Sequence, residues 1–233
     1  MTQLKTQGIY RFDCFGDEVI AAFSGREFPR AQWNEYLREL GLDASRLVTL
    51  RQIHSANLVL VQPKSIPGEE TPADGLITRM PGAVLGIQTA DCIPVFFWDP
   101  EHQAVGIVHA GWRGLYYGIN QKAVQAFRQN FLSRPAHLQV AIGPSIRKCC
   151  YEVGAEFKDY FPRHFETVAG THGETIHVDL AAALKSELIS EGVDPAHIHD
   201  SGYCTSCRND AFFSYRREKE TPERILSVMA LKS

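Results

Sequence analysis

The 233-residue chain lacks a long uninterrupted apolar run and an excess of basic charge. Its longest apolar stretch, residues 83–98, contains Gln88, Thr89 and Asp91, so the sequence predicts no membrane span. The 24 lysines and arginines are balanced by 27 acidic residues, and this net charge of −3 argues against a general nucleic-acid binder. The first residues contain no apolar segment typical of a signal peptide, so we expect a cytoplasmic protein.

Internal repeats, low-complexity segments and long linkers are also absent from the sequence. The most loop-like segment, residues 63–72, is rich in proline and is typical of a surface loop. A chain of this length buries enough surface to fold without a stabilising disulfide or structural metal ion. We therefore expect one domain, residues 1–233, with no nucleic acid or membrane as a partner. A monomer is a plausible state, although the sequence does not specify the oligomeric state.

Helix and strand patterns follow one another along the chain. Apolar residues at helical spacing predict helices over residues 30–40, 115–131 and 180–188, the last capped by Asp179 and ended by Gly192. Strands are predicted at residues 47–53, 58–61, 75–78, 84–88, 93–98, 104–108, 137–142, 212–215 and 225–229. Several of these strands are continuous apolar runs, typical of strands buried on both faces. The fold class predicted is a layered α/β domain.

Reactive side chains occur at three points where predicted strands end. His54 lies between two short strands, Cys92 interrupts an apolar run, and His109 ends a strand. Two imidazoles and one thiolate suit a catalytic zinc that keeps its fourth position open. Their separation along the chain is unlike a compact zinc motif, so the alternative remains that these are unrelated residues at strand ends.

The turn after His109 has the composition of an anion site. Gly111 and Gly114 permit close backbone approach, and the forked guanidinium of Arg113 suits phosphate or carboxylate. A helix starting after Gly114 would direct free N–H groups into this turn. The pattern is neither a Walker A motif nor a dinucleotide fingerprint. The alternative is a tight turn with a solvated or ion-paired arginine.

A competing metal hypothesis concerns the C-terminal part of the chain. His197 and His199 precede Cys204 and Cys207, and these four side chains would suit a closed structural zinc site. One Cys-x-x-Cys with a nearby His-x-His is a weaker pattern than two paired Cys-x-x-Cys motifs. The other cysteines are expected to be small buried residues.

Nine short blocks form an ordered pattern along most of the chain. They are residues 52–54 (Gln-Ile-His), 73–75 (Ala-Asp-Gly), 89–94 (Thr-Ala-Asp-Cys-Ile-Pro), 109–114 (His-Ala-Gly-Trp-Arg-Gly), 143–144 (Gly-Pro) with 151–154 (Tyr-Glu-Val-Gly), 178–180 (Val-Asp-Leu), 204–205 (Cys-Thr) and 213–216 (Phe-Ser-Tyr-Arg). In order and spacing the pattern resembles the laccase-domain family, first described as multicopper polyphenol oxidases and now usually described as purine nucleoside phosphorylases. The resemblance runs from about residue 47 to residue 217, and blocks 89–94 and 109–114 are highly specific.

The resemblance implies a catalytic zinc held by His54, Cys92 and His109, with copper as the weaker alternative. It implies phosphorolysis of adenosine, inosine and S-methyl-5'-thioadenosine, which gives the free base and a ribose 1-phosphate. Adenosine deamination is a further activity attached to the family. The implied fold is a single α/β sandwich with mixed sheets, resembling the catalytic domain of cytotoxic necrotizing factor.

The expected site residues follow from the matching blocks. The catalytic residues expected are Cys92, His109 and Asp91, and the residues expected around the phosphate are Arg113, Gly111 and Gly114. Asp91 is a candidate for proton transfer because it neighbours Cys92. Its alternative role is to orient the Cys92 side chain at the metal. The expected substrates are small purine nucleosides and phosphate.

The N-terminal part departs from the family pattern. Family members carry a glycine- and serine-rich segment there, followed by a Ser-Leu-Asn block and an Asn-Arg pair. Here residues 23–29 run almost directly into the helix that contains Asn34 and Glu35, and the family's C-terminal Gly-Arg is Glu223-Arg224. If the missing segment normally contributes to the substrate pocket, specificity or rate will differ in this chain.

Three other functions stay open at this point. A copper-dependent polyphenol oxidase would use the same three ligands. A metal-independent hydrolase would use Cys92 as nucleophile and His109 as base, and thiol alkylation would inhibit it where chelators do not. A protein-binding module would hold no stoichiometric metal and would turn over no nucleoside.

Overall fold

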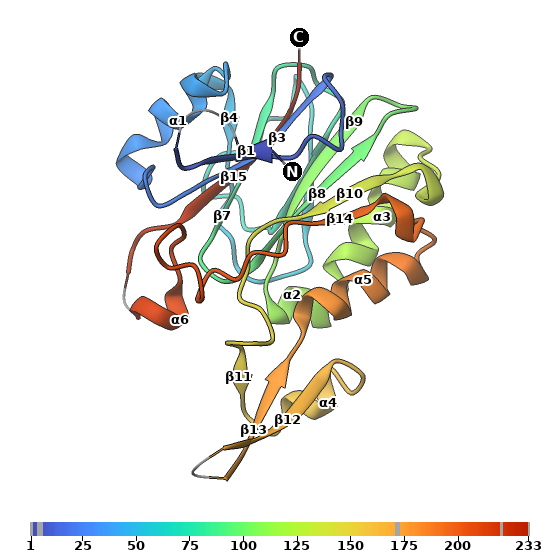
Figure 1. The fold of residues 1–233 in the computed structure, drawn as a ribbon. Coiled ribbons are helices and arrows are strands. Elements are labelled where there is room, and N and C mark those ends of the chain that lie inside the picture. The colour runs from blue at the N-terminus through green and yellow to red at the C-terminus, as the bar shows by residue number, and fades with distance from the viewer. Residues whose placement is uncertain (1, 4–6, 171–172, 220, 233) are drawn as a thin grey trace.

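The computed structural model describes residues 2–3, 7–170, 173–219 and 221–232. The remaining positions of the predicted 1–233 domain, residues 1, 4–6, 171–172, 220 and 233, lie outside the described residues. Two six-stranded sheets pack face to face, and helices cover the outer face of each sheet (Figure 1). Among the described helices, none combines the length and apolar character that crossing a membrane requires. The layered α/β architecture with mixed sheets is therefore as predicted.

The first sheet contains both ends of the described chain. Its strands, in spatial order, are β1 (Thr2–Gln3), β2 (Ile9–Arg11), β3 (Val19–Ser24), β15 (Ile225–Leu231), β7 (Val84–Thr89) and β4 (Leu47–Val48). Only the β4–β7 pair is parallel among these described strands. The outer face is covered by α1 (Trp33–Glu39), which follows the short 3-10 helix η1 (Arg30–Gln32) and buries Trp33, Tyr36 and Leu37.

The second sheet carries most of the strands that lead to the polar blocks. Its spatial order is β14 (Ile198–Asp200), β10 (Gln139–Ile142), β8 (Ile93–Asp99), β9 (Ala104–Ala110), β6 (Gly75–Thr78) and β5 (Leu58–Val61). The β10–β14 and β5–β6 pairs are parallel, and the others are antiparallel. Aromatic side chains such as Phe12, Phe23 and Phe96 fill the space between the two sheets.

Helices α2 (Trp112–Tyr116), α3 (Ile119–Phe131) and α5 (Leu180–Ser190) cover the outer face of the second sheet. The helix predicted over residues 115–131 is confirmed from Ile119 to Phe131 as α3. Its predicted start is wrong, because Gly118, whose φ of 74° is left-handed, separates α3 from α2. The third predicted helix is confirmed as α5. Its cap is Asp179, whose side chain accepts a hydrogen bond from the backbone of Ala182 at 2.9 Å.

A small third sheet projects from the body below α2 (Figure 1). It consists of β11 (Glu152–Val153), β13 (Gly173–Val178) and β12 (Phe165–Gly170), with α4 (Phe157–Tyr160) beside it. The ring of Trp112 joins it to the body, with ring centroids 5.1 Å from Phe157 and 5.4 Å from Tyr160. The sequence patterns did not predict these three strands. Residues 166–169 of β12 are exposed, whereas β13 buries Ile176 and Val178.

Two other strand predictions need correction. The strand predicted at residues 47–53 ends at Val48, and the chain continues as a loop that reaches His54. The strand predicted at residues 212–215 is wrong, because these residues form a turn and the start of α6 (Tyr215–Glu218). The ring of Phe212 packs on Tyr10 and Tyr203. This apolar residue is therefore buried as part of a loop and not by strand pairing. The remaining short 3-10 helices are η2 (Ala44–Arg46), η3 (Pro135–His137) and η4 (Pro195–His197).

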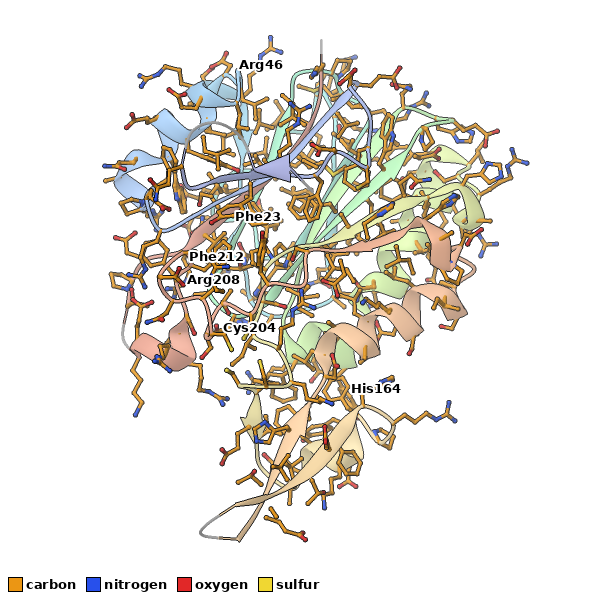
Figure 2. All side chains as sticks on the ribbon, in the orientation of Figure 1. Phe23, Arg46, His164, Cys204, Arg208 and Phe212 are labelled. Atoms are coloured by element: carbon orange, nitrogen blue, oxygen red, sulfur yellow. The ribbon has the colours of Figure 1, made fainter. Side chains whose placement is uncertain are left out.

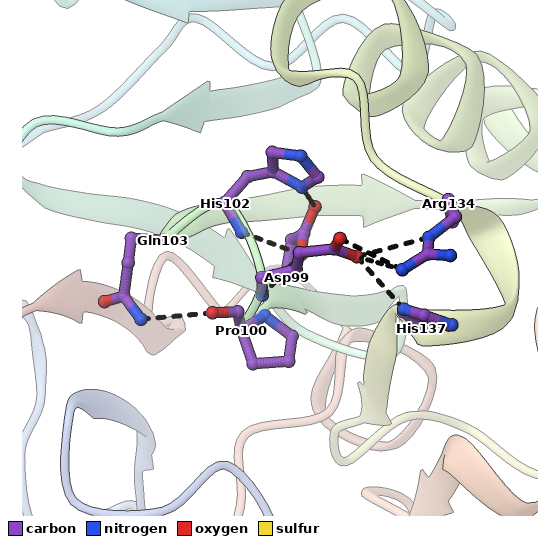
Figure 3. A network of polar contacts seen from close by, with 7 residues as sticks. Asp99, Pro100, His102, Gln103, Arg134 and His137 are labelled. Carbon is purple, nitrogen blue, oxygen red and sulfur yellow. Dashed lines mark hydrogen bonds and ion pairs between the residues drawn. The ribbon is translucent and has the colours of Figure 1, made fainter.

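The turn between β8 and β9 lies at the opposite end of these strands from the polar blocks. Asp99 accepts hydrogen bonds from the backbone of Glu101 and His102, and its other oxygen lies 2.9 Å from Nδ1 of His102 (Figure 3). Glu101 pairs with Arg134 and His137 next to it. This network fixes the β8–β9 hairpin at its far end.

Candidate metal centre and active-site pocket

The three predicted metal ligands meet where β8 begins and β9 ends. Pro94 pairs with His109 in the β8–β9 ladder, so Cys92, two residues before Pro94, lies beside the end of β9. The loop before β5 brings in His54, whose Nε2 is 3.9 Å from Sγ of Cys92. One donor atom from each of His54, Cys92 and His109 lies within 4.8 Å of the others. The predicted convergence of the three side chains is confirmed.

Asp74 holds two of these ligands in place. Its fully buried carboxylate accepts hydrogen bonds from the backbone N–H of His54 at 2.9 Å and of Ser55 at 2.6 Å. Nδ1 of His109 lies 2.9 Å from the same carboxylate. Burial would raise the pKa of Asp74, but the hydrogen bonds from His109 and Ser55 lower it. Asp74 belongs to the block at residues 73–75, but no local sequence pattern predicts that it orients the two histidines.

The contact with Asp74 sets the chemistry of His109. When Nδ1–H donates to the carboxylate, Nε2 is left for a metal or for Cys92. Burial opposes charge on both partners. Even so, the charge of His109 and hydrogen bonds from both histidines lower the pKa of Cys92 to about 6. The charge of Cys92 and the bond to Asp74 in turn raise the pKa of His109 to about 9. Cys92 is therefore held as a thiolate, the form that binds metal.

Gly111 leaves room for two of the ligands. A Cβ at this position would lie 2.9 Å from Cδ2 of His54 and 3.1 Å from Sγ of Cys92. Gly111 is also the N-cap of α2, so the prediction that the helix starts after Gly114 is wrong. Gly114 lies inside α2, where a Cβ would stand 3.0 Å from the backbone oxygen of Ser55. Neither glycine lines the pocket, and both instead allow close packing around the ligands.

Two ligand-bearing loops contain strained backbone. His54 has φ of 57° and Asp91 has φ of 87°, both in the left-handed region that residues with a side chain rarely adopt. Such conformations cost on the order of 1–3 kcal/mol each and persist only where neighbouring groups hold them. The carboxylate of Asp74 supplies this restraint for His54.

Asp91 joins three segments around the ligand Cys92. One carboxylate oxygen accepts a hydrogen bond from the hydroxyl of Thr205 at 2.6 Å, and the other accepts from the backbone N–H of Arg216 at 2.7 Å. Its backbone oxygen accepts from the N–H of Ile146 at 2.9 Å. With both oxygens engaged, this carboxylate is placed to orient the loop that carries Cys92.

A pocket of about 710 Å³ opens over the three ligands, a volume in the range of small-molecule sites. It lies where the two large sheets meet, because its lining includes Gln88 of β7 in the first sheet and His109 of β9 in the second. The side chain of Gln52 hydrogen-bonds both backbone groups of Gln88, at 2.7 and 2.8 Å. The lining combines the ligands with aromatic, apolar and cationic side chains: Leu50, Gln52, His54, Gln88, Thr89, Ala90, Asp91, Cys92, His109, Trp112, Arg113, Ile146, Tyr151, Tyr215, Arg216 and Arg224.

Three arginines give the pocket positive charge. Arg113 stacks on the ring of Trp112, 4.5 Å from its centroid, and within the described part of the chain no carboxylate forms an ion pair with it. Arg216 donates to the backbone oxygen of Glu152 at 2.8 Å and lies over Tyr151. Arg224 also lines the pocket. Only Arg113 was predicted from the sequence, although Arg216 ends the block at residues 213–216.

The donor set can hold a metal ion. Two imidazoles and one thiolate are ligands that zinc uses where a fourth position stays open, and the pocket lies over these three side chains. The space kept free by Gly111 and the bond from Asp74 to His109 are the supports that such a centre needs.

The competing C-terminal zinc site is not formed. His197 uses Nδ1 to hydrogen-bond the backbone oxygen of Ala136 at 2.9 Å. Cys204 and Cys207 lie beside Cys149 and Cys150 instead of the two histidines. The prediction that joined His197 and His199 to these cysteines is therefore wrong.

The fold and site define a class of protein: a four-layer α/β enzyme with a two-histidine, one-cysteine centre under an arginine-lined pocket. A family model described as "Multi-copper polyphenol oxidoreductase laccase" matches residues 30–232, and the chain belongs to this family. The resemblance found in the sequence blocks is thereby confirmed.

Relatives of the chain carry two kinds of name. A protein named "Adenosine deaminase RL5", from an unknown prokaryotic organism, is 33% identical over 223 residues, 90% of this chain and 82% of that protein. "Purine nucleoside phosphorylase YlmD" from Geobacillus stearothermophilus is 33% identical over 210 residues, 82% of this chain and 74% of that protein. The crystal structure of YlmD from this organism matches with a TM-score of 0.90 at 26% identity, covering 99% of this chain and 98% of that one.

Proposed function

We propose that the chain is a zinc-dependent purine nucleoside phosphorylase that acts on adenosine, inosine and S-methyl-5'-thioadenosine. The observation that carries the proposal is the convergence of His54, Cys92 and His109 under a pocket lined by three arginines. The names of the relatives support the substrate class. The products are the free base and ribose 1-phosphate, or its methylthio derivative.

His54, Cys92 and His109 would hold the zinc, which supplies Lewis-acid charge beside the reacting atoms. Asp74 keeps His109 oriented and holds the His54 loop, so the ligands need little reorganisation when the metal binds. Asp91 orients the Cys92 loop through Thr205, and this positioning role replaces proton transfer as the role we propose for it.

Arg113 is the residue we assign to phosphate. Its guanidinium lies in the pocket wall, and its planar fork matches two phosphate oxygens. Arg216 and Arg224 add positive charge in the same cavity. A five-residue helix such as α2 contributes little dipole, so side chains and not a helix end account for the anion site. Gly111 and Gly114 are assigned to packing around the ligands.

The reaction needs phosphate and nucleoside held in line. An oxygen of hydrogen phosphate attacks the anomeric carbon, the bond from that carbon to the purine nitrogen breaks, and its electron pair leaves with the base. The base takes up the proton that hydrogen phosphate loses, so the products are the neutral base and the sugar phosphate dianion. Arg113 neutralises the attacking phosphate. The rings of Trp112, Tyr151 and Tyr215 line the pocket and offer faces on which a purine can stack.

Adenosine deamination is the second activity we propose for the same pocket. Water replaces the exocyclic amine of the purine, giving inosine and ammonia. The name of the relative "Adenosine deaminase RL5" favours this candidate. Phosphate is not a reactant here, so a phosphate-free assay separates the two activities.

Copper oxidation of phenols is the weaker alternative. Two histidines and one cysteine bind copper as well as zinc, and the description of the matched family names copper. The thiolate character of Cys92 also allows a metal-independent hydrolase, which would keep its activity in chelator. Both alternatives make predictions about metal dependence that differ from ours.

We also infer that residues 1–233 form one domain. β15 pairs with β3 on one side and β7 on the other, so segments from the start, middle and end of the chain share one sheet. The likeness to the catalytic domain of cytotoxic necrotizing factor stays a prediction.

The experiment is to incubate metal-quantified protein with adenosine, with and without phosphate, and to separate the products by chromatography. Adenine and ribose 1-phosphate that depend on phosphate support phosphorolysis, and inosine formed without phosphate supports deamination. A protein that holds one zinc at this site and forms neither product contradicts the nucleoside proposal.

A further inference from the structure

A second cluster of metal-ligating side chains lies outside the centre described above. The thiols of Cys149, Cys150, Cys204 and Cys207 come together with their sulfur atoms all within 4.8 Å of one another. Cys204 lies close to the place where the small third sheet joins the body (Figure 2). We propose that these four cysteines bind a structural zinc ion, separate from the centre at Cys92.

The distances suit one tetrahedral ion. Sγ of Cys207 lies 3.4 Å from Sγ of Cys150 and 3.5 Å from Sγ of Cys149. A zinc–sulfur bond of ~2.3 Å gives a tetrahedron with edges of ~3.8 Å, so a small adjustment of side chains completes the site. The sulfurs are too far apart for a disulfide, whose S–S bond is about 2.05 Å. They are also too close for a [4Fe–4S] cluster, in which each cysteine binds a different iron atom.

The backbone around the cluster is already in place. Residues 145 and 204 form a parallel bridge, in which the N–H of Ser145 donates to Tyr203 at 3.2 Å and the N–H of Thr205 donates to Ser145 at 3.0 Å. The guanidinium of Arg147 spans both segments, because it donates to the backbone of Tyr203 and pairs with Asp200 at 2.7 Å. A site prepared in this way loses little backbone entropy when the ion binds.

The four cysteines differ in exposure. Cys204 is buried and Cys150 is partly buried, whereas Cys149 and Cys207 are exposed. The neighbouring ammonium group of Lys148 forms an ion pair with Glu166 at 2.6 Å and not with the cysteine sulfurs. Four thiolates with no open position are the donor set of a structural zinc site.

The position of the cluster gives it a function in the architecture of the pocket. Cys150 is followed directly by Tyr151, which lines the active-site pocket. Cys204 is followed directly by Thr205, which holds the carboxylate of Asp91 beside Cys92. A zinc at the four cysteines therefore ties together two segments that shape one wall of the pocket.

Metal counting on the intact protein tests the proposal without any nucleoside. Cys92→Ser removes the thiolate of the first centre, so zinc retained by this variant after gel filtration reports on the four cysteines. We expect one zinc per chain, and we expect it to be lost when Cys149→Ser and Cys207→Ser are added. Both positions are exposed, so serine there leaves the core intact. Cys92→Ser with Cys14→Ser is the matched control and should keep its zinc.

Cobalt provides a second readout. Co²⁺ in Cys92→Ser should give the strong thiolate charge-transfer absorption of a tetrathiolate site, and the added substitutions should abolish it. Absence of bound zinc and of this absorption in Cys92→Ser would overturn the proposal. A disulfide would also overturn it. Wild-type protein unfolded with chelator would then titrate fewer than its six thiols. Since no readout involves turnover, failure here would leave the phosphorylase proposal standing.

Discussion

The carboxylate of Asp74 lies 2.9 Å from Nδ1 of His109 and at the same time accepts the backbone N–H of His54, also at 2.9 Å. One buried side chain therefore positions two proposed metal ligands that are far apart in the sequence. The position of Asp74 just before β6 makes this possible, because β6 pairs with β9, the strand that carries His109. Removing its charge should affect the metal before it affects the rest of the fold.

Asp74→Asn should lower zinc affinity about 10- to 100-fold, the usual cost of losing a group that orients a metal-bound histidine. The amide keeps the size of the side chain. Its NH₂ group, however, cannot accept the hydrogen bonds that the N–H groups of His54, Ser55 and His109 donate to the carboxylate. Competition with a zinc indicator dye measures the affinity. Asp99→Asn is the matched control, since Asp99 is also buried and bonded to a histidine, far from the site (Figure 3). Equal zinc affinity in Asp74→Asn and wild type would refute the orienting role.

Gly111→Ala should weaken metal binding by at least ~10-fold without unfolding the protein. The new methyl group would lie 2.9 Å from His54 and 3.1 Å from Cys92, so at least one ligand must move. The φ of Gly111 is −73°, which alanine adopts without strain. Metal content after gel filtration and the thermal midpoint are the two measurements.

Gly68→Ala serves as the control for this substitution, because a Cβ there meets no atom within 4 Å. It should keep both metal and stability. Full zinc retention in Gly111→Ala would show that the close approach of Gly111 to the ligands has no part in metal binding.

Arg113→Gln should raise KM for phosphate about 10- to 100-fold, the loss expected when a charge-assisted hydrogen bond to a bound anion is removed. KM for adenosine and zinc content should change much less, because Arg113 contacts neither ligand nor base in the proposed arrangement. Steady-state kinetics at varied phosphate measure the effect. Arg128→Gln, an exposed arginine of α3, is the control. An unchanged KM for phosphate would remove Arg113 from the anion site.

Stability should depend on pH through Glu187. Burial raises the pKa of this residue from its ordinary value of 4.5 to about 7, although Asn120 donates a hydrogen bond to it at 3.1 Å. Between these two values the folded protein binds more protons than the unfolded chain, so stability falls as pH rises through this window. Above pH 7 the carboxylate is charged in the folded protein, and burying this charge lowers the free energy of unfolding.

Glu187→Gln keeps an acceptor for Asn120 and removes the charge. We therefore expect a higher Tm than wild type at pH 8, and a difference that disappears toward pH 4. Thermal unfolding followed by circular dichroism across this range measures it. Glu174→Gln, at an exposed position of β13, should shift Tm equally at all pH values. A variant no more stable than wild type at pH 8 would show that Glu187 is not buried at a cost.

Much of the fold follows from local patterns. Strands β5 and β6 and helix α5 lie where apolar spacing and the cap Asp179 predict them, because burial and capping act within a few residues. The predicted start of the helix over residues 115–131 is wrong because of Gly118, since spacing does not report a left-handed residue. Phe212 was misassigned to a strand because burial by a loop gives the same local pattern as burial in a sheet.

The site depends on tertiary pairing that no local pattern specifies. The β8–β9 register brings Cys92 beside His109, and the paths through β5 and β6 bring His54 to them. The blocks shared with the laccase-domain family identified these three residues. The blocks gave no role to Asp74 or Arg216, and spacing paired Cys204 with the wrong partners. Its true neighbours, Cys149 and Cys150, are joined to it only by contacts between distant segments.

The central claim is that the ion held by His54, Cys92 and His109 is needed for nucleoside cleavage. The most direct measurement adds zinc back to chelator-stripped protein while adenine release from adenosine is followed in the presence of phosphate. We predict no release without metal, a rise that saturates once the site is filled, and no release by Cys92→Ala at any zinc concentration. Full phosphate-dependent release by the stripped protein, or by Cys92→Ala, would contradict the claim.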